Sequence, residues 1–232
     1  MADNSLKGWD FSAKTYSLSY GTLAHRLDSD LFEYLGSRIE GAVVADLGCG
    51  PGIVARKFAE LGARKIYAID VSEKMLDQVG DHPGIVTRQA TMEVSPLDSI
   101  REEDPDASDG FDIVLFKRSL YMERPAAIKV LSNAYSHLRS DGYITIIHPE
   151  KRIVRYAFGH PPRLHLYTPY NLFNRTLSRI GVRMGIEKYT LHTQEELVDL
   201  AGEVAGPEAV ELIPTVQNSF NMLAIHKQTA QI

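Results

Sequence analysis

The chain has 232 residues, of which 44% are hydrophobic and 24% charged, and this composition is typical of a globular protein and excludes wholesale disorder or a collagen-like chain. A formal net charge of −5 argues against nucleic acid as a general partner, because proteins that bind phosphate backbones usually carry a basic excess. The single cysteine, Cys49, excludes an internal disulfide framework and zinc sites built from paired cysteines. We therefore expect a cytoplasmic protein with no membrane segment and no metal site.

Five short apolar runs alternate with amphipathic stretches in the first two-thirds of the chain. Each run is continuously apolar, as a strand must be when both faces of its sheet are covered. The predicted strands are 43–47, 66–70, 84–87, 111–116 and 143–148. This alternation is typical of βαβ units on a parallel sheet.

The stretches between these strands have helical spacing and recognisable end signals. Gly62 is placed to end the first helix, Ser72 to cap the second, and Pro125 to begin the third. The predicted helices span 53–61, 72–79 and 126–138. The acidic segment 95–110 predicts a short helix and a solvated loop without a chemical role.

The last part of the chain predicts one helix and two further strands. Thr193 and Glu196 form a capping-box pattern that opens a helix through Ala201. The runs 208–213 and 220–226 are joined by so short a link that the final strand should be antiparallel. We predict a single α/β domain over 1–232, made of a helical cap (1–40), a cofactor-binding core (41–149), an inserted lid (150–190) and a closing helix with its strand pair (191–232).

A glycine-rich turn follows the first predicted strand and opens directly into a helix. Asp46 begins this turn, and Gly48, Gly50 and Gly52 occupy alternate positions in it. Glycines let the backbone turn tightly and approach a ligand closely, while a helix N-terminus presents N–H groups to it. Asp70 ends the second strand, where a carboxylate can bind both ribose hydroxyls. The arrangement predicts a nucleotide-type cofactor.

The charge of Asp46 indicates which cofactor this is. An anionic pyrophosphate would sit poorly beside a carboxylate, and the turn reads G-x-G-x-G where a dinucleotide site needs G-x-G-x-x-G. Asp46 would favour a sulfonium cation, while the loop amides would favour the carboxylate of an amino-acid tail. We therefore predict S-adenosyl-L-methionine, with S-adenosyl-L-homocysteine as the product.

Several segments resemble a known family. The segment 43–52 is similar to motif I of the class I S-adenosylmethionine-dependent methyltransferases, and 69–76 resembles the ribose-binding segment that follows it. The resemblance continues through 111–115 and 138–143. It implies a Rossmann-like, doubly wound seven-stranded sheet whose last strand is antiparallel, and a small-molecule methyltransferase that acts by in-line methyl transfer.

The resemblance also implies which residues hold the cofactor. The loop glycines line its methionine end, and Asp70 holds its ribose. The family often has an acidic residue near the adenine after the third strand, where this chain has Gln89 and Ala90 instead. The other implied contacts are Val71 beside the adenine, and Phe116 and Lys117 at the methionine tail.

Two further features suggest roles without settling them. Tyr16 and Tyr20 lie in a leading segment that resembles helices closing over the cofactor, and core packing is the alternative. His148 ends the fifth predicted strand, on the side of the sheet where ligands gather. A hydroxyl acceptor would benefit from His148 as a general base, whereas a carboxylate acceptor would need no base.

The predicted lid is basic and aromatic, although the chain as a whole is acidic. No acidic residue occurs in 151–186. Arginine binds carboxylate and phosphate in a bidentate way, so we predict an anionic or aromatic small-molecule acceptor, free or bound to a carrier. The predicted substrate-binding residues are Arg152, Arg155, Arg163, His165 and Tyr167. A solvated basic helix is the alternative.

Three other functions stay open on the sequence. A nucleic-acid methyltransferase could use the basic segment, although Phe116-Lys117-Arg118-Ser119 stands where an amino-methylating enzyme has its aromatic-Pro tetrapeptide. A methyltransferase-fold protein could steer a reaction without methylating, and a nicotinamide-dependent oxidoreductase shares the strand, glycine turn and ribose acid. The oligomeric state is open between monomer and homodimer.

Overall fold

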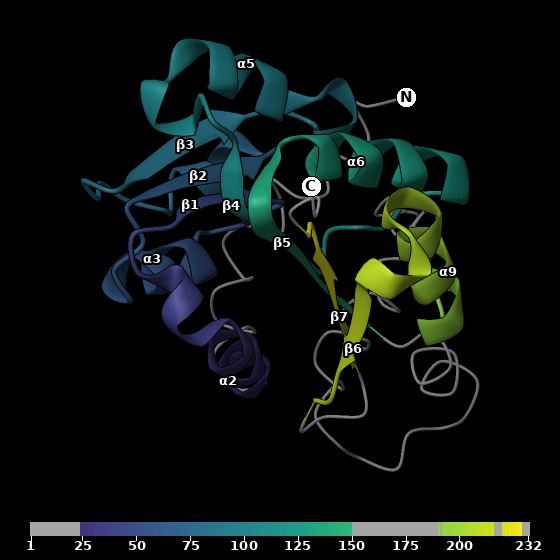
Figure 1. Ribbon diagram of the computed structural model, residues 1–232. Helices are drawn as coiled ribbons and strands as arrows, with labels where there is room; N and C mark the ends of the chain where they lie inside the picture. The colour runs from purple at the N-terminus through teal and green to yellow at the C-terminus, as the bar shows by residue number, and fades with distance from the viewer. Residues whose placement is uncertain (1–23, 150–189, 191, 216–219, 229–232) are drawn as a thin grey trace, which may run out of the picture.

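The computed structural model describes residues 24–149, 190, 192–215 and 220–228, which form one sheet with helices on both faces (Figure 1). The strands are β1 (Val43–Leu47), β2 (Lys65–Asp70), β3 (Ile85–Gln89), β4 (Phe111–Lys117), β5 (Leu138–Pro149), β6 (Val210–Ile213) and β7 (Phe220–His226). The α-helices are α2 (Ala24–Leu35), α3 (Ile53–Glu60), α4 (Glu73–Leu76), α5 (Pro96–Glu103), α6 (Arg124–Ser136) and α9 (Gln194–Ala205). Short 3₁₀ helices are η1 (Gly36–Ile39), η2 (Met92–Val94), η3 (Pro105–Ala107) and η5 (Pro207–Ala209). None of the helices in the described ranges combines the length and apolar character of a membrane span.

The seven strands lie in the order β3-β2-β1-β4-β5-β7-β6. Strands β1 to β5 run parallel to one another, and β7 is antiparallel to both β5 and β6. The predicted seven-stranded sheet with an antiparallel last strand is therefore confirmed. The strand order reverses between β1 and β4, and in open α/β sheets ligands bind outside the carboxyl ends of the strands at such a point.

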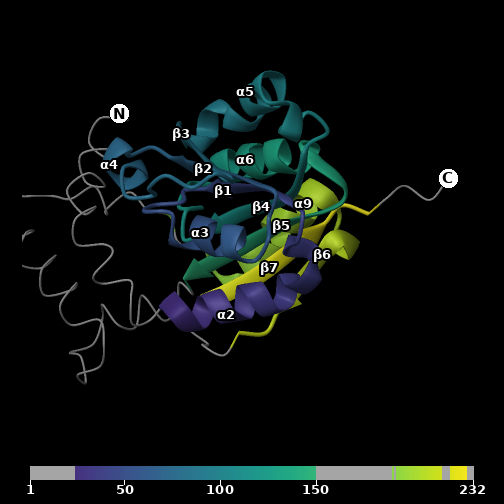
Figure 2. The ribbon, with the colours of Figure 1, turned by 90° about the vertical axis from the view of Figure 1, so that its left-hand side faces the viewer.

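Two hydrophobic layers enclose the sheet, as the continuously apolar strands predict. On one face α2 and α3 pack through residues such as Leu31, Leu35 and Phe58. On the other face α5, α6 and α9 contribute residues such as Ile100 and Leu131. Figure 2 shows α2 and α3 together on one side of the sheet, and α5 and α6 on the other. The doubly wound architecture is confirmed.

The predicted helix caps are present. The Ser72 hydroxyl accepts a hydrogen bond from the Met75 N–H (3.3 Å), although α4 ends at Leu76, short of the predicted 79. Thr193 and Glu196 form both bonds of the capping box, at 3.2 and 2.8 Å. The sequence therefore predicts the first residues of these helices more accurately than their last residues.

Strand β5 begins five residues before the predicted start at 143. Leu138 already pairs with Phe111, and the register then shifts before Tyr143 pairs with Ile113. Asp141 has a φ of 63°, in the left-handed region. The prediction that the helix runs to 138 and that a turn separates it from the strand is wrong, because a bulge inside the strand takes the place of that turn.

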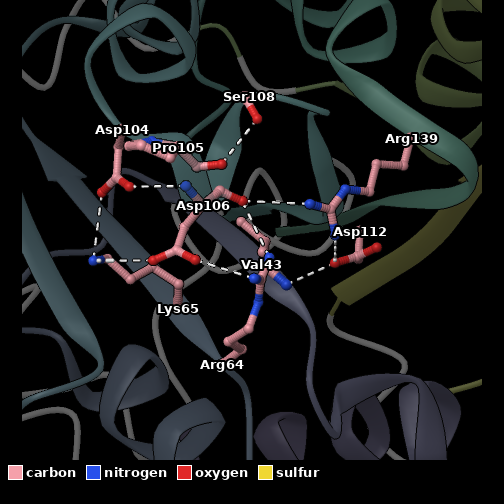
Figure 3. A network of polar contacts seen from close by, with 9 residues as sticks. All are labelled: Val43, Arg64, Lys65, Asp104, Pro105, Asp106, Ser108, Asp112 and Arg139. Atoms are coloured by element: carbon pink, nitrogen blue, oxygen red, sulfur yellow. Dashed lines mark hydrogen bonds and ion pairs between the residues drawn. The ribbon is translucent and has the colours of Figure 1, made fainter.

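Asp106 in the acidic segment after β3, and Asp112 in β4, form ion pairs and hydrogen bonds with neighbouring strands. Asp106 contacts Arg64 at 3.0 Å and Lys65 at 3.6 Å, at the amino end of β2 (Figure 3). Asp112 accepts hydrogen bonds from the Val43 N–H (2.7 Å) and from a guanidinium N–H of Arg139 (2.8 Å). Each exposed pair contributes little by itself. Together they connect the amino ends of β1, β2 and β4 to the start of β5, at the edge of the sheet opposite the glycine loop.

Candidate functional site

The glycine loop between β1 and α3 has a backbone that only glycine adopts easily. Gly48, Gly50 and Gly52 have φ values of 82°, 55° and 70°. A Cβ on Gly48 would lie 2.4 Å from the Ser119 Cβ, and a Cβ on Gly52 would lie 2.9 Å from both Val79 methyl carbons. The loop therefore needs glycine for its backbone conformation and also for its close contacts with neighbouring segments.

The N-terminus of α3 faces the loop without a side-chain cap. Gly52 is the N-cap residue, and among the described residues it gives the helix no side-chain cap. The first-turn N–H groups of such a helix are suited to an anionic or polar ligand group. Arg56 holds the loop from the other side, because its guanidinium donates to the carbonyl oxygens of Pro51 and Val79, both at 2.9 Å.

Asp70, the predicted ribose ligand, connects the glycine loop to the end of β2. Its Oδ2 accepts a hydrogen bond from the Gly50 N–H at 2.8 Å, and its Oδ1 accepts one from the Ser72 N–H at 2.9 Å. The predicted adenine contacts lie on the adjacent strand end. The Gln89 side-chain amide donates to the Val71 carbonyl oxygen at 3.2 Å. The Ala90 N–H donates to the Asp70 carbonyl oxygen at 3.0 Å.

Asp46 is a buried carboxyl group at the carboxyl end of β1. It is 2% exposed, and its Oδ2 makes no hydrogen bond within the described ranges. Burial, and secondarily the charge of Asp70, raise the pKa of Asp46 to about 7. Such a group is expected to bind a cation or a hydrogen-bond donor, because a buried carboxylate oxygen without a partner is unfavourable.

Asp46 shares a small pocket with the loop and with Lys117. The lining residues are Asp46, Gly48, Cys49, Gly50, Pro51, Ile53, Val54 and Lys117. Four of the predicted cofactor residues (Asp46, Gly48, Gly50 and Lys117) thus lie together, between β1, α3 and the end of β4. The pocket offers about 20 Å³, which is the space of about one water molecule.

Lys117 forms an ion pair that the sequence did not predict. Its ammonium contacts the carboxylate of Asp28, in the N-terminal part of α2, and the two side chains are 4% and 13% exposed. Burial, and secondarily the charge of Arg118, lower the pKa of Lys117 well below its usual value. No local pattern identifies Asp28, because its significance depends on how α2 packs against the sheet.

The residues around Lys117 have different roles. Phe116 is fully buried in the core beneath α5 and α6, and it does not line the pocket. Arg118 has a φ of 56°, a strained conformation of the kind that clusters at functional sites. The next residue, Ser119, lies against Gly48, and its buried hydroxyl has no hydrogen-bond partner in the described structure. Sequence reasoning missed Ser119, which is available to bind a polar ligand group.

His148 lies at the end of β5, beside Tyr121 and His192, with ring centroids at 5.3 and 5.5 Å. Its Nε2 accepts a hydrogen bond from the His192 N–H at 3.1 Å, so the proton of the neutral ring lies on Nδ1. Burial, and secondarily the charge of His192, lower its pKa to about 3, whereas Glu196 acts in the opposite direction. The general-base role stays a prediction, and both the occupied Nε2 and the low pKa count against it.

The low pKa of His148 predicts how stability depends on pH. Since the folded pKa lies below the unfolded value of about 6.5, the contribution of the neutral ring is complete above pH 6.5 and is lost as pH falls toward 3. We expect the difference in unfolding free energy between the wild type and His148→Gln to shrink by about 2 kcal/mol from pH 7.5 to pH 5.0. Urea unfolding at the two pH values measures it. The exposed His82, as His82→Gln, is the control, and a constant difference for both variants would contradict the prediction.

Several predicted site residues lie outside the described ranges. Tyr16 and Tyr20 belong to the chain before α2, and the proposed lid lies between β5 and α9. The substrate-binding predictions there are Arg152, Arg155, Arg163, His165 and Tyr167. All seven residues remain predictions from the sequence.

The strand order with an antiparallel β7, the glycine loop after β1 and the carboxylate at the end of β2 define the class I, Rossmann-like methyltransferase fold. Residues 44–142 match a family model described as a methyltransferase domain. Over these residues the chain is similar to that methyltransferase-domain family.

Two curated methyltransferases are similar to this chain in sequence, and a solved structure is similar to it in fold. Ribosomal protein L11 methyltransferase from Aquifex aeolicus (strain VF5) is 25% identical over 140 residues, which are 60% of this chain and 53% of that protein. Ubiquinone biosynthesis O-methyltransferase from Xanthomonas euvesicatoria pv. vesicatoria (strain 85-10) is 31% identical over 87 residues, which are 37% of this chain and 36% of that protein. The matches therefore span about half or less of these relatives. The structure of the DhpI–SAH complex has a TM-score of 0.63 and 15% identity, and covers 97% of this chain and 96% of that chain.

Proposed function

We propose that this chain binds S-adenosyl-L-methionine between β1 and β4 and transfers its methyl group to a small-molecule acceptor. The observation that carries the proposal is the pocket in which Asp46, the glycine loop and Lys117 lie together at the carboxyl ends of the strands. The DhpI neighbour is a complex with SAH, and both curated relatives named above are methyltransferases, which supports the same cofactor and reaction.

The residues of the pocket fit this cofactor chemically. The buried Asp46 Oδ2, which has no partner in the described structure, suits a positively charged group. Gly48 leaves space beside Ser119 that any other side chain would fill. The uncapped first turn of α3 offers N–H groups to a polar ligand. Asp70 stands where a carboxylate binds ribose hydroxyls in this fold class.

The cofactor supplies a methyl group on a sulfonium, and the protein has to position the acceptor in line with it. Holding two reactants in this alignment contributes as much as about 7–11 kcal/mol to lowering a barrier. Asp70, the loop amides and Asp46 hold the donor side. Ser119, with its buried hydroxyl beside Gly48, is placed to hydrogen-bond a group at the donor site or on the acceptor.

The acceptor is proposed from the sequence of the segment after β5. That segment carries Arg152, Arg155 and Arg163 and lacks acidic residues through 186, which favours an anionic or aromatic metabolite, free or carrier-bound. His148, with its proton on Nδ1, would then act as a hydrogen-bond donor to an acceptor oxygen. A protein acceptor is the second candidate, because one relative is a ribosomal protein methyltransferase.

Calorimetric titration with S-adenosylmethionine, S-adenosylhomocysteine and NAD tests the cofactor. We expect micromolar binding of the first two and no binding of NAD. Transfer of a labelled methyl group to a panel of carboxylates, phenols and ribosomal proteins then tests the reaction. Binding of NAD alone would refute the proposal and indicate a dehydrogenase, whereas cofactor binding without methyl transfer to any tested acceptor would favour a role in steering another reaction.

A further inference from the structure

Lys117 is a cation buried where a ligand is expected. Its side chain is 4% exposed, and it forms one wall of the pocket with Asp46 and the glycine loop. Burial of an ammonium group is costly unless an anion compensates it. A ligand that brings a negative charge to Lys117 would therefore favour the charged form of this side chain.

The pocket presents one basic and one acidic group. Lys117 and Asp46 are both lining residues, at the ends of the adjacent parallel strands β4 and β1. A carboxylate and an ammonium group on one ligand, as in the amino-acid end of S-adenosylmethionine, would complement this pair. The ammonium, in place of the sulfonium expected from the sequence, suits Asp46, whose Oδ2 has no hydrogen-bond partner in the described structure. The carboxylate suits Lys117, in addition to the loop amides.

Asp28 carries the same chemical group as that ligand carboxylate. It reaches Lys117 from α2, whose Phe32 contacts Phe58 of α3 with ring centroids 5.2 Å apart, and which lies beside α3 in Figure 2. The pocket offers about 20 Å³, the space of about one water molecule, so its lining groups would have to move apart to admit an amino-acid end.

On the basis of the proposed function, we propose that Lys117 binds the α-carboxylate of S-adenosylmethionine and that Asp28 holds Lys117 in the absence of the cofactor. When S-adenosylmethionine binds, its α-carboxylate replaces the Asp28 carboxylate as the partner of Lys117. Lys117 therefore selects cofactors that carry a carboxylate, and Asp28 competes with the cofactor for Lys117.

Two cofactors that differ by one group test this exchange. Calorimetric dissociation constants are measured for S-adenosylmethionine and decarboxylated S-adenosylmethionine, with the wild type and with Lys117→Met, Lys117→Arg and Asp28→Asn. The wild type should prefer the carboxylate-bearing cofactor by at least about 10-fold, since a charge-assisted hydrogen bond contributes about 1.5 kcal/mol or more. Lys117→Met should abolish this preference, and Lys117→Arg should keep it.

Asp28→Asn should tighten binding of S-adenosylmethionine about 3-fold or more, because the competing carboxylate is gone. The exposed residues Lys57 and Glu33, changed separately as Lys57→Met and Glu33→Gln, serve as controls, with dissociation constants close to wild type. Thermal unfolding establishes that each variant is folded.

The outcomes distinguish a failure of the proposed carboxylate exchange at Lys117 from a failure of the proposed methyltransferase function. If Lys117→Met weakens both cofactors equally, or if the wild type shows no preference, the exchange is refuted while the methyltransferase function stands. If Asp28→Asn weakens S-adenosylmethionine, Asp28 supports the site and does not compete for it, which also refutes the exchange. If the wild type binds neither cofactor, the proposed function itself fails.

Discussion

The variant Asp70→Ala is expected to bind S-adenosylmethionine about 100-fold more weakly than the wild type. Asp70 is predicted to accept hydrogen bonds from the ribose hydroxyls, and it holds the Gly50 and Ser72 N–H groups at 2.8 and 2.9 Å. Two charge-assisted bonds to the ligand contribute at least about 3 kcal/mol, which corresponds to about 100-fold in affinity. Calorimetric titration of wild type and variant measures the change.

The control for this variant is Asp77→Ala, which removes an exposed carboxylate just after α4. It should bind the cofactor as the wild type does. Urea unfolding of Asp70→Ala reports separately on the lost contacts with the loop, so a folded variant with weakened binding supports the assignment. Binding within about threefold of wild type would show that Asp70 is not a cofactor ligand.

The variant Gly48→Ala is expected to lower the free energy of unfolding by about 3 kcal/mol or more and to abolish cofactor binding. The φ of 82° costs about 1–2 kcal/mol for a residue with a Cβ. The new methyl group would also lie 2.4 Å from the Ser119 Cβ, and relief of such an overlap costs about 1–3 kcal/mol. Urea unfolding measures the stability of the variant.

The variant Gly41→Ala separates the cost of the positive φ from the cost of the overlap with Ser119. Gly41 has a φ of 73°, and a Cβ there would meet nothing within 4 Å, so this variant should lose only about 1–2 kcal/mol. The double variant Gly48→Ala/Ser119→Gly should recover part of the stability that Gly48→Ala loses. Equal losses for Gly41→Ala and Gly48→Ala would show that the loop does not pack against Ser119.

Much of the fold follows from local sequence patterns. Apolar runs identified the five parallel strands within a few residues, apart from the start of β5, and the two runs after α9 gave β6 and β7. The glycines with Asp70 identified the loop and its carboxylate partner. These features depend on residues close in sequence, or on the spacing that a βαβ unit imposes. The bulge at the start of β5 was missed because it depends on the pairing of Leu138 with Phe111.

The parts of the site that the sequence did not reveal depend on contacts between distant segments. Asp28 meets Lys117 across 89 positions of the chain, and Ser119 meets Gly48 only because β4 lies beside β1. The pKa of Asp46 depends on burial and on the position of Asp70, neither of which a motif specifies. Phe116 was assigned to the cofactor from its place in the motif, whereas its side chain belongs to the core.

The hydrogen bond between His192 and His148 has a consequence for how this protein could diversify. The chain that leaves the sheet after β5 returns to the end of that same strand before α9 begins, because the His192 N–H lies 3.1 Å from the His148 Nε2. The two ends of the intervening segment are thus anchored at one point of the scaffold. Insertions, deletions or exchanges within it need not stretch or shift any strand. If this segment binds the acceptor, as proposed above, acceptor preference could therefore evolve by replacing it, while the residues that hold the methyl donor stay unchanged.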